Sequence, residues 1–560
     1  MNQFIFRNLE FHSSRMWQWA QVEEALDFMA AHGLNGLIFH QNDLIDQLVV
    51  PTRYFSDELM LKRWPVRLHT IENNRQYINK VVRSASARGI KFFLQVKELW
   101  FPDGLIEFSP RLRNPDGSFC PNNPFWWEFL GEKMNELLSV VPGLAGVVVS
   151  PGTRESKISI STNTCTCPAC RATTPVDWYA RLLETIFKPL DACGKLLAVR
   201  DFSYSADQQG HIIRAAAKCS DRIVISLKNT PHDYYPTFPD NPAIGRVGGL
   251  RQWVEFDTWG QFYGLGFFPA GVVEDMQRRM LHCRAEGAIG ISLRTDWEVI
   301  TEGSSFNSLN MLNVFAGAAL SSDLDAGLDD IYRSWAARGL RSALKSGSSQ
   351  YRPSVPANTR AFEKLRDFMR ASWSVIEKTV FIRGHVFNED CMFPDTIGKG
   401  FDEMVKIHGM DDWKPGASGL VAVNVDNITI ILAEKEAAVR EAAALPGILD
   451  PDRLGLNTEL ADELREMLDL YGYYVEGFSH CARVCYLTRL AAQTSDEEDT
   501  RRAKAVISGL EDFSKKLAAR LTGTDYPHYV YWLLDHHRLE SLTMDAAGSL
   551  HAARGKESAV

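Results

Sequence analysis

Polar and charged residues follow nearly every short apolar run in the first part of the chain. In order these residues are His12, His40, Lys97, Glu98, Arg154, Glu155, Arg200, Asp201, Lys228, Asn229, Glu255, Asp257, Arg294 and Asp296. Enzymes built on a barrel of parallel strands gather their catalytic groups at the carboxyl ends of those strands. Some of these residues must be solvated bystanders, but their recurrence indicates that at least half line a common pocket.

The charges in this set suit chemistry on an acidic sugar. The cations can hold an anionic group, and arginine binds a carboxylate through two parallel hydrogen bonds. These cations are Lys97, Arg154, Arg200, Lys228 and Arg294. Glycoside hydrolysis commonly uses two carboxyl groups, one as general acid and one as base or nucleophile. The candidate carboxyl groups are Glu98, Glu155, Glu255, Asp257 and Asp296.

The apolar runs that precede these residues read as strands that alternate with helices. The predicted strands are Phe6–Phe11, Leu34–His40, Ile90–Val96, Leu144–Val149, Leu196–Arg200, Arg222–Leu227, Trp253–Asp257 and Ala288–Leu293. Predicted helices lie between them, among them Met16–His32 and Asn74–Arg88. This pattern predicts an α/β fold, a (β/α)8 barrel over residues 1–322. An open doubly wound sheet is the rival, but no Gly-rich phosphate loop follows the first strand.

Aromatic residues accompany the same strand ends. Trp259 and Trp297 lie next to candidate carboxylates, and ligand pockets commonly combine aromatic walls with a few polar groups. Other aromatic residues there cover the barrel mouth. We therefore expect both tryptophans, together with His40, to contact the substrate.

Residues 323–560 are predicted to form a mostly α-helical carboxyl-terminal domain. Long helical patterns run over Thr359–Lys378, Ile430–Ala444, Thr458–Ala491 and Glu497–Leu521. A Gly/Ser/Pro-rich stretch, Ser346–Pro356, predicts a loop near the junction, and the end, Gly548–Val560, is expected to be frayed. We expect this domain to cap the barrel or to form a homodimer interface.

Composition limits the classes of partner. The 560 residues carry a net charge of -9, whereas a nucleic-acid partner requires a basic stripe. The sequence contains no run of eighteen apolar residues, so no membrane span is predicted. Its first residues lack the pattern of a signal peptide. The ten cysteines therefore read as reduced thiols of a cytoplasmic protein. A small carbohydrate is the expected partner, with neither nucleic acid nor membrane.

Three of these cysteines lie close together in the sequence. Cys165, Cys167 and Cys170 have a spacing that can bind zinc, but a closed structural zinc site requires four ligands. A distant residue could supply the fourth, and none is near in sequence. A reduced, tightly turned segment is favoured, and we expect no metal and no cofactor.

Three segments resemble the alpha-glucuronidase-like glycoside hydrolases. Ile225–Pro242 is similar to that family's strand ending in Lys-Asn before a Pro/Asp loop, and Arg251–Pro269 to its next strand. Gly287–Leu320 resembles its last strand, with a rim aspartate and an Asn-rich helix. Cys165–Cys170 is similar to a cysteine knuckle of related barrels. Together the segments cover a minor part of the chain.

The resemblance implies roles at the matching positions. Lys228 and Asn229 match a substrate-binding pair, and Asp296 matches the rim aspartate, our choice of general base. Gln261 stands where relatives place a glutamate, and a glutamine cannot donate a proton as a carboxylic acid does. Either Glu255 or Asp257 is then the acid, or the activity differs, or the glutamine is a deliberate replacement. Gln261 itself would contact the substrate.

The sequence thus predicts an exo-acting glycoside hydrolase of carbohydrate metabolism, acting on an acidic, uronic-acid-type sugar or oligosaccharide. A sugar isomerase, epimerase or lyase on the same barrel is one alternative. It would use His12, His40 and Lys97 as acid and base or to hold a divalent metal. A non-catalytic carbohydrate-binding protein that has lost its acid is the other, and Gln261 is the reason for considering it.

Overall fold

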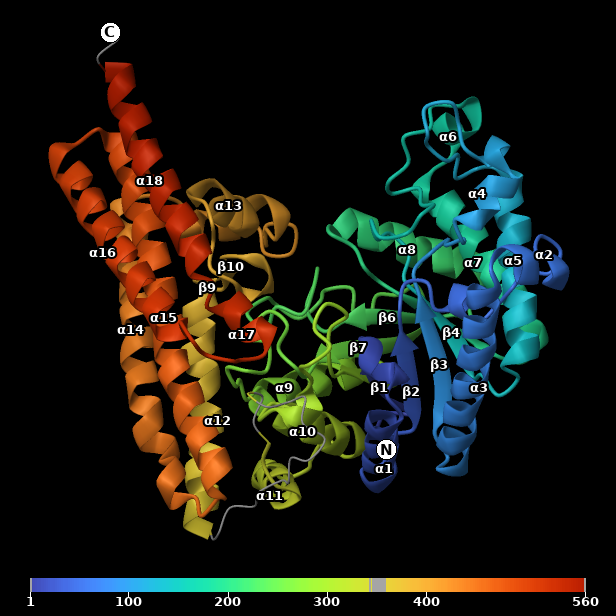
Figure 1. Ribbon diagram of the computed structural model, residues 1–560, viewed down its shortest axis with the longest axis horizontal. Helices are drawn as coiled ribbons and strands as arrows, with labels where there is room; N and C mark the ends of the chain where they lie inside the picture. Colours follow the sequence, from blue (N-terminus) through green and yellow to red (C-terminus); the bar gives the residue numbers. More distant parts are fainter. Residues whose placement is uncertain (1–2, 342–343, 345–358, 558–560) are drawn as a thin grey trace.

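The computed structural model describes residues 3–341, 344 and 359–557, and its amino-terminal part is a closed barrel of eight parallel strands (Figure 1). Each strand pairs with its neighbours in sequence, and β8 pairs with β1. The strands are β1 (Phe6–Phe11), β2 (Gly36–His40), β3 (Lys91–Val96), β4 (Gly146–Val149), β5 (Leu196–Arg200), β6 (Val224–Lys228), β7 (Arg251–Asp257) and β8 (Gly290–Arg294). The predicted barrel is confirmed, and each strand end lies within two residues of its predicted position.

Helices lie between the strands and after the last strand of the barrel. They are α1 (Trp19–Ala31), α2 (Asp57–Arg63), α3 (Pro65–Ala87), α4 (Gly104–Phe108), α5 (Pro124–Val140), α6 (Pro168–Ala172), α7 (Pro175–Ala192), α8 (Ala206–Cys219), α9 (Val273–Ala285) and α10 (Met311–Ser322). The predicted helix Met16–His32 is divided, because Ser13 caps a short 3-10 turn before α1. Segment 229–250, which is described throughout, joins β6 to β7 by turns instead of a helix.

The barrel interior has an apolar floor and a polar upper layer. Ile38, Phe93, Val148, Ala198, Val224 and Trp253 form an apolar cluster that is separate from the main core. Side chains alternate along a strand, so the residue two positions farther along points into the same interior. These next residues are polar and buried, and they include His40, Gln95, Ser150, Arg200, Ser226 and Glu255. The interior is therefore closed below and offers hydrogen-bonding groups toward the loops above.

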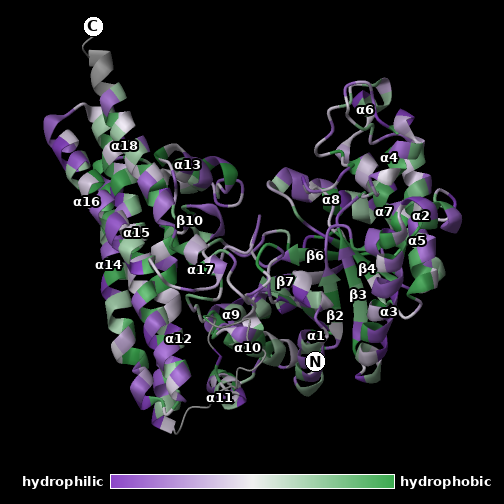
Figure 2. Cartoon of the chain, viewed as in Figure 1, coloured by the Kyte–Doolittle hydropathy of each residue, from purple (hydrophilic) through white to green (hydrophobic). Residues whose placement is uncertain are grey.

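The rest of the chain is mostly helical, as the sequence predicts. Its elements are α11 (Leu328–Arg338), α12 (Thr359–Val380), β9 (Phe381–Ile382), β10 (His385–Val386), α13 (Ile397–Asp402), α14 (Val425–Leu449), α15 (Thr458–Thr494), α16 (Glu497–Leu521), α17 (His528–Leu533) and α18 (His536–Glu557). Helices α12, α14, α15, α16 and α18 lie side by side next to the barrel (Figure 1). Figure 2 shows hydrophobic and hydrophilic residues alternating along them, as in helices with one buried face.

Several details differ from the prediction or lie beyond it. The short antiparallel pair β9–β10 was not expected in this part of the chain. Helix α18 continues to Glu557, through most of the segment that was expected to be frayed, and residues 558–560 lie outside the described part of the chain. The predicted loop Ser346–Pro356 lies outside the described residues. Helix α10 ends at Ser322, where the first domain is predicted to end, and the division into two domains stays a prediction.

The helical part packs against the loop that follows β7. Phe268 stacks on Tyr471 and Tyr474, with ring centroids 4.8 and 4.4 Å apart. The amide of Gly271 donates to Ser372 Oγ at 3.0 Å. These contacts bring the helical part to the rim of the barrel, while the homodimer stays a prediction. Among the described residues no helix is both long and apolar enough to span a bilayer.

The apolar floor generates a first prediction. A Cβ atom on Gly290 would lie 2.3 Å from Trp253 Cδ1 and 2.8 Å from Phe6 Cβ. We expect Gly290→Ala to lower the free energy of unfolding by about 1–3 kcal/mol, because overpacking forces rings out of place. Urea unfolding of the purified variant measures this loss. Gly131→Ala in α5 is the control, since a Cβ there meets nothing within 4 Å; equal stabilities would contradict the packing argument.

Candidate active site

A buried guanidinium group lies at the centre of the polar layer. Arg200 Nε lies 2.7 Å from Glu255 Oε2, and its Nη1 lies 3.3 Å from Glu10 Oε1. Its Nη2 donates to the hydroxyl of Tyr234. Burial by itself lowers the pKa of Arg200, but the charges of Glu10 and Glu255 outweigh it and hold the pKa well above its ordinary value. Arg200 is therefore a permanent cation held between two carboxylates.

Glu255 is engaged on both of its oxygens. Ser226 Oγ donates to Oε1 at 2.5 Å, and the Tyr234 hydroxyl donates to Oε2 at 2.7 Å, beside the ion pair with Arg200. The residue is 2% exposed. This geometry makes Glu255 a part of the barrel wall and does not favour the predicted role of general acid.

Two stacked histidines lie beside this network. The rings of His12 and His40 are 3.7 Å apart and nearly parallel. Burial, together with nearby cations, lowers the pKa of both well below the ordinary value, so both are neutral. Arg294 Nε donates to His12 Nδ1 at 3.0 Å, which leaves the ring proton on Nε2. That nitrogen lies 3.0 Å from Glu298 Oε2, to which it donates.

The same histidines test the predicted alternative of a metal-dependent isomerase. Ligand atoms of Glu10, His12 and His40 lie within 4.8 Å of one another. However, Arg200 Nη1 is 3.3 Å from Glu10 Oε1 and 3.1 Å from His40 Nδ1, and Arg294 donates to His12. Guanidinium groups thus lie where a metal cation would bind, and their positive charge would repel such a cation. The arrangement favours a hydrogen-bonded network.

His40 also offers an open hydrogen-bonding position. Its Nε2 atom is buried and has no hydrogen-bond partner among the described residues. Buried polar atoms in native proteins are nearly always paired. A hydroxyl group of a bound substrate would satisfy this nitrogen, which supports the predicted role of His40 in binding.

Asp257 shapes the loop after β7. Its Oδ1 accepts from the amide of Trp259 at 3.0 Å, and its Oδ2 accepts from the amides of Gly260 and Gln261 at 3.0 and 2.9 Å. Burial raises its pKa, and these amides with Arg294 oppose that rise. Because both oxygens are engaged by the backbone, the predicted role of Asp257 as acid is not favoured.

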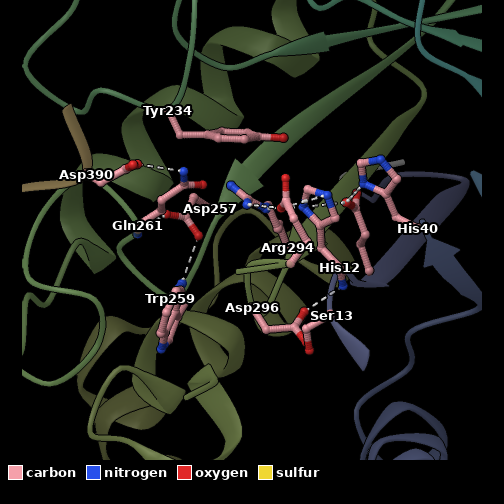
Figure 3. A network of polar contacts seen from close by, with 12 residues as sticks. His12, Ser13, His40, Tyr234, Asp257, Trp259, Gln261, Arg294, Asp296 and Asp390 are labelled. Atoms are coloured by element: carbon pink, nitrogen blue, oxygen red, sulfur yellow. Dashed lines mark hydrogen bonds and ion pairs between the residues drawn. The ribbon is translucent and has the colours of Figure 1, made fainter. Parts of the chain in front are cut away.

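Asp296 joins the last strand to the first. Its Oδ1 accepts from the amide of His12 at 2.7 Å, its Oδ2 accepts from Ser13 Oγ, and its exposed fraction is 0%. Figure 3 shows the carboxylate turned toward Ser13 and away from Tyr234. This position suits the orientation of His12 and does not favour the predicted role of Asp296 as general base.

Gln261 meets a carboxyl group from the helical part of the chain. Its Nε2 donates to Asp390 Oδ1 at 2.9 Å, and Figure 3 shows the two side chains facing each other. Burial raises the pKa of Asp390 to about 7, and Glu389 adds to the rise. Asp390 and Cys391 both have left-handed backbone conformations, φ 55° and 52°. Cys391 Sγ accepts from the amide of Gly264 at 3.2 Å, which fastens this segment to the barrel loop.

Two buried lysines converge at the rim from different strands. Lys97 follows β3 and Lys228 ends β6, yet their ammonium groups lie 4.3 and 4.0 Å from the ring centroid of Phe202. Lys97 pairs with Glu155 at 2.8 Å, and Lys228 pairs with Asp233 at 2.9 Å. Burial lowers the pKa of Lys228. Together with Arg294 they give the mouth a cluster of cations, as predicted.

The remaining predicted residues lie apart from this centre. Glu98 accepts hydrogen bonds from an amide and a hydroxyl of the loop after β4, and burial raises its pKa to about 8. Arg154 is exposed, and its guanidinium group lies 5.9 Å from the centroid of the Tyr204 ring. Asn229 lines a small cavity between β7 and α9. Trp259 is 1% exposed and points away from Tyr234 in Figure 3, a position that does not favour the predicted sugar contact. Trp297, 8% exposed, packs against Trp532.

Several residues of this site were missed or given another role by the sequence analysis. They are Glu10, Asp233, Tyr234, Glu298 and Asp390. Glu10 points into the barrel by the alternation of β1, and Glu298 lies two residues beyond Asp296, so both carry a local signal. Asp390 carries none, because it lies 129 residues from Gln261.

Comparisons with known proteins show a likeness of fold. No family model and no curated protein matches the sequence. Among solved structures the chain is similar to a GH138 enzyme targeting pectin rhamnogalacturonan II, at 11% identity and a TM-score of 0.61, covering 93% of this chain and 62% of that one. It is also similar to a mutant of the Thermobaculum terrenum O-GlcNAc hydrolase, at 12% identity and a TM-score of 0.44, covering 99% and 97%. The chain thus spans less than two thirds of the GH138 structure.

The central ion pair generates a second prediction. We expect Glu255→Gln to lower the free energy of unfolding by about 3 kcal/mol, because Arg200 is left buried with too little opposite charge. Thermal and urea unfolding measure the loss. Glu184→Gln removes an exposed pair with Lys188, 2.8 Å apart, and serves as control. Such exposed pairs contribute little, so losses of equal size in both variants would contradict this view of Arg200.

Proposed function

We propose that this protein is a glycoside hydrolase that removes an acidic, uronic-acid-type residue from the end of a sugar chain. Its general acid in this proposal is Asp390, which accepts a hydrogen bond from Gln261. The pKa of Asp390, raised by burial to about 7, supports the role, because a carboxyl group near the working pH can deliver a proton. The carboxyl group that is absent at position 261 would thus be supplied by Asp390, from the helical part of the chain. The contact between Gln261 and Asp390 is the observation that carries the proposal.

Glu298 is the general base in the proposal. Its side chain is 38% exposed, whereas Glu255, Asp257 and Asp296 are buried. His12 Nε2 orients it at 3.0 Å. Its charge contributes to the raised pKa of Asp390, which supports a shared site. Asp296 is given the role of holding the backbone of His12, in place of the catalytic role predicted from the sequence.

The converging cations support an acidic substrate. The ammonium groups of Lys97 and Lys228 both lie close to the ring of Phe202, and two buried ammonium groups repel each other. Each has one carboxylate partner, and a further anion between them would lower the repulsion. A uronate carboxylate supplies such an anion, and an alpha-glucuronide is the substrate that the sequence resemblance implies.

The acid generates a third prediction. We expect Asp390→Asn to lower kcat/KM on unactivated uronides by about 10²–10⁴-fold, the usual contribution of a general acid. Because the acid must hold its proton, wild-type activity should fall as the pH rises through the Asp390 pKa of about 7. The Asn variant should lose this alkaline decline. Aryl uronides with good leaving groups, which need little proton donation, should be affected much less.

Asp412→Asn, an exposed carboxylate of the same region, is the matched control and should keep the wild-type profile. An alkaline decline that persists in Asp390→Asn would contradict the assignment of the acid. Activity that is lost with a chelator while circular dichroism and thermal stability stay unchanged would instead favour the isomerase or lyase alternative. Tight uronate binding without turnover would favour the binding protein.

The substrate charge generates a fourth prediction. We expect Lys228→Met to lower kcat/KM for a uronide by about 10–100-fold, the loss of a charge-assisted hydrogen bond. The matched neutral glycoside lacks the carboxylate and should be hydrolysed as before or faster. Steady-state kinetics on the two substrates measure the ratio. Equal losses on both would show that Lys228 acts through structure and not through the carboxylate.

A further inference from the structure

Four cysteine thiols meet at the rim of the barrel, away from the candidate active site. Cys120 comes from the segment between β3 and α5, Cys165 and Cys167 come from the loop after β4, and Cys170 lies in the short helix α6 that follows. Their four sulfur atoms all lie within 4.8 Å of one another. Cys120 Sγ is 3.8 Å from Cys167 Sγ and 3.6 Å from Cys170 Sγ. The fourth thiol that the local spacing lacks is therefore supplied by the preceding loop.

These distances suit a tetrahedral metal centre. Zinc binds thiolates at about 2.3 Å, which places the sulfur atoms of a tetrahedron about 3.8 Å apart. A disulfide requires a sulfur–sulfur distance of about 2.05 Å, and all ten cysteines of the chain are free. Four ligands fill the coordination shell, as in zinc sites that stabilise a fold.

The surrounding groups are those that hold metal-bound thiolates in place. The amide of Cys170 donates to Cys167 Sγ at 3.4 Å, where Cys167 caps the short helix α6. Asn122 Nδ2 donates to Cys170 Sγ at 3.3 Å. Hydrogen bonds of this kind orient ligands and stabilise their negative charge. We propose that Cys120, Cys165, Cys167 and Cys170 bind one structural zinc ion.

The zinc ion would fasten two loops that carry rim residues of the active site. Glu98 follows β3, and it accepts hydrogen bonds from Gly152 and Ser159 in the β4 loop at 2.5 and 3.0 Å. Lys97 and Glu155 form an ion pair between the same two loops at 2.8 Å. The four thiols lie farther out along both loops, where a metal bridge restrains their relative movement. The ion thus has a structural role and takes no part in catalysis.

Metal analysis of the whole protein tests this proposal without reference to activity. Protein purified under reducing conditions from zinc-supplemented cells should contain one zinc ion per chain by mass spectrometry. Replacement by cobalt should give the thiolate charge-transfer and tetrahedral d–d bands of a four-sulfur site. Cys120→Ser should lose most of the zinc and the four-sulfur spectrum. Cys193→Ser, an exposed thiol outside the cluster, is the control and should keep both.

Three outcomes would overturn the proposal. The first is wild-type protein with neither stoichiometric zinc nor cobalt–thiolate bands. The second is a Cys120→Ser variant that keeps its zinc and its four-sulfur spectrum while circular dichroism shows it folded. The third is a thiol titration in denaturant in which these cysteines react only after reduction, since that would show disulfides in place of a metal. The wild-type measurements decide the question even if the variant does not fold.

Discussion

The guanidinium group of Arg200 lies in the dry centre of the barrel, where its charge is tolerated because Glu10 and Glu255 lie on either side of it. An unpaired charge in such a place costs several kcal/mol. The pairing in turn orients Tyr234, which bonds to both Arg200 and Glu255. The apolar floor below, built around Trp253, keeps water from the lower side. The charges of Arg200, Glu10 and Glu255 in the barrel interior therefore balance one another. The polar groups that remain available to a ligand lie above them, toward the mouth of the barrel.

Carboxylates near the mouth fall into two groups according to what they bind. Asp257 and Asp296 accept hydrogen bonds from backbone amides, and they hold the loops after β7 and β1 in place. Glu298 and Asp390 bind side chains and lie toward the mouth. A carboxylate whose oxygens are taken up by the backbone cannot readily exchange protons with a ligand. In the proposed hydrolase, this difference in partners separates the carboxylates that position loops from those that transfer protons.

The helical part of the chain completes the site that the barrel begins. Asp390 lies in a segment with left-handed backbone at a residue other than glycine, a conformation that costs about 1–3 kcal/mol and occurs often at functional sites. Contacts of Cys391 with the amide of Gly264 and with Tyr474 hold that segment against the barrel loop. The strain is thus stabilised by packing between the two parts. A barrel without the helices would keep Gln261 but would lack its carboxyl partner.

Local patterns in the sequence determined the barrel, the helices and the rim position of Lys97, Lys228 and Arg294. Alternation and helical periodicity are properties of neighbouring residues, and parallel strands bring their carboxyl ends to one edge. Tertiary structure alone decided that Asp257 and Asp296 turn to the backbone, that Asp390 meets Gln261, and that Cys120 joins Cys165, Cys167 and Cys170. These contacts join loops that are distant in sequence or depend on how a loop folds back. Their geometry is set by packing between elements, which no periodic pattern of neighbouring residues in the sequence encodes.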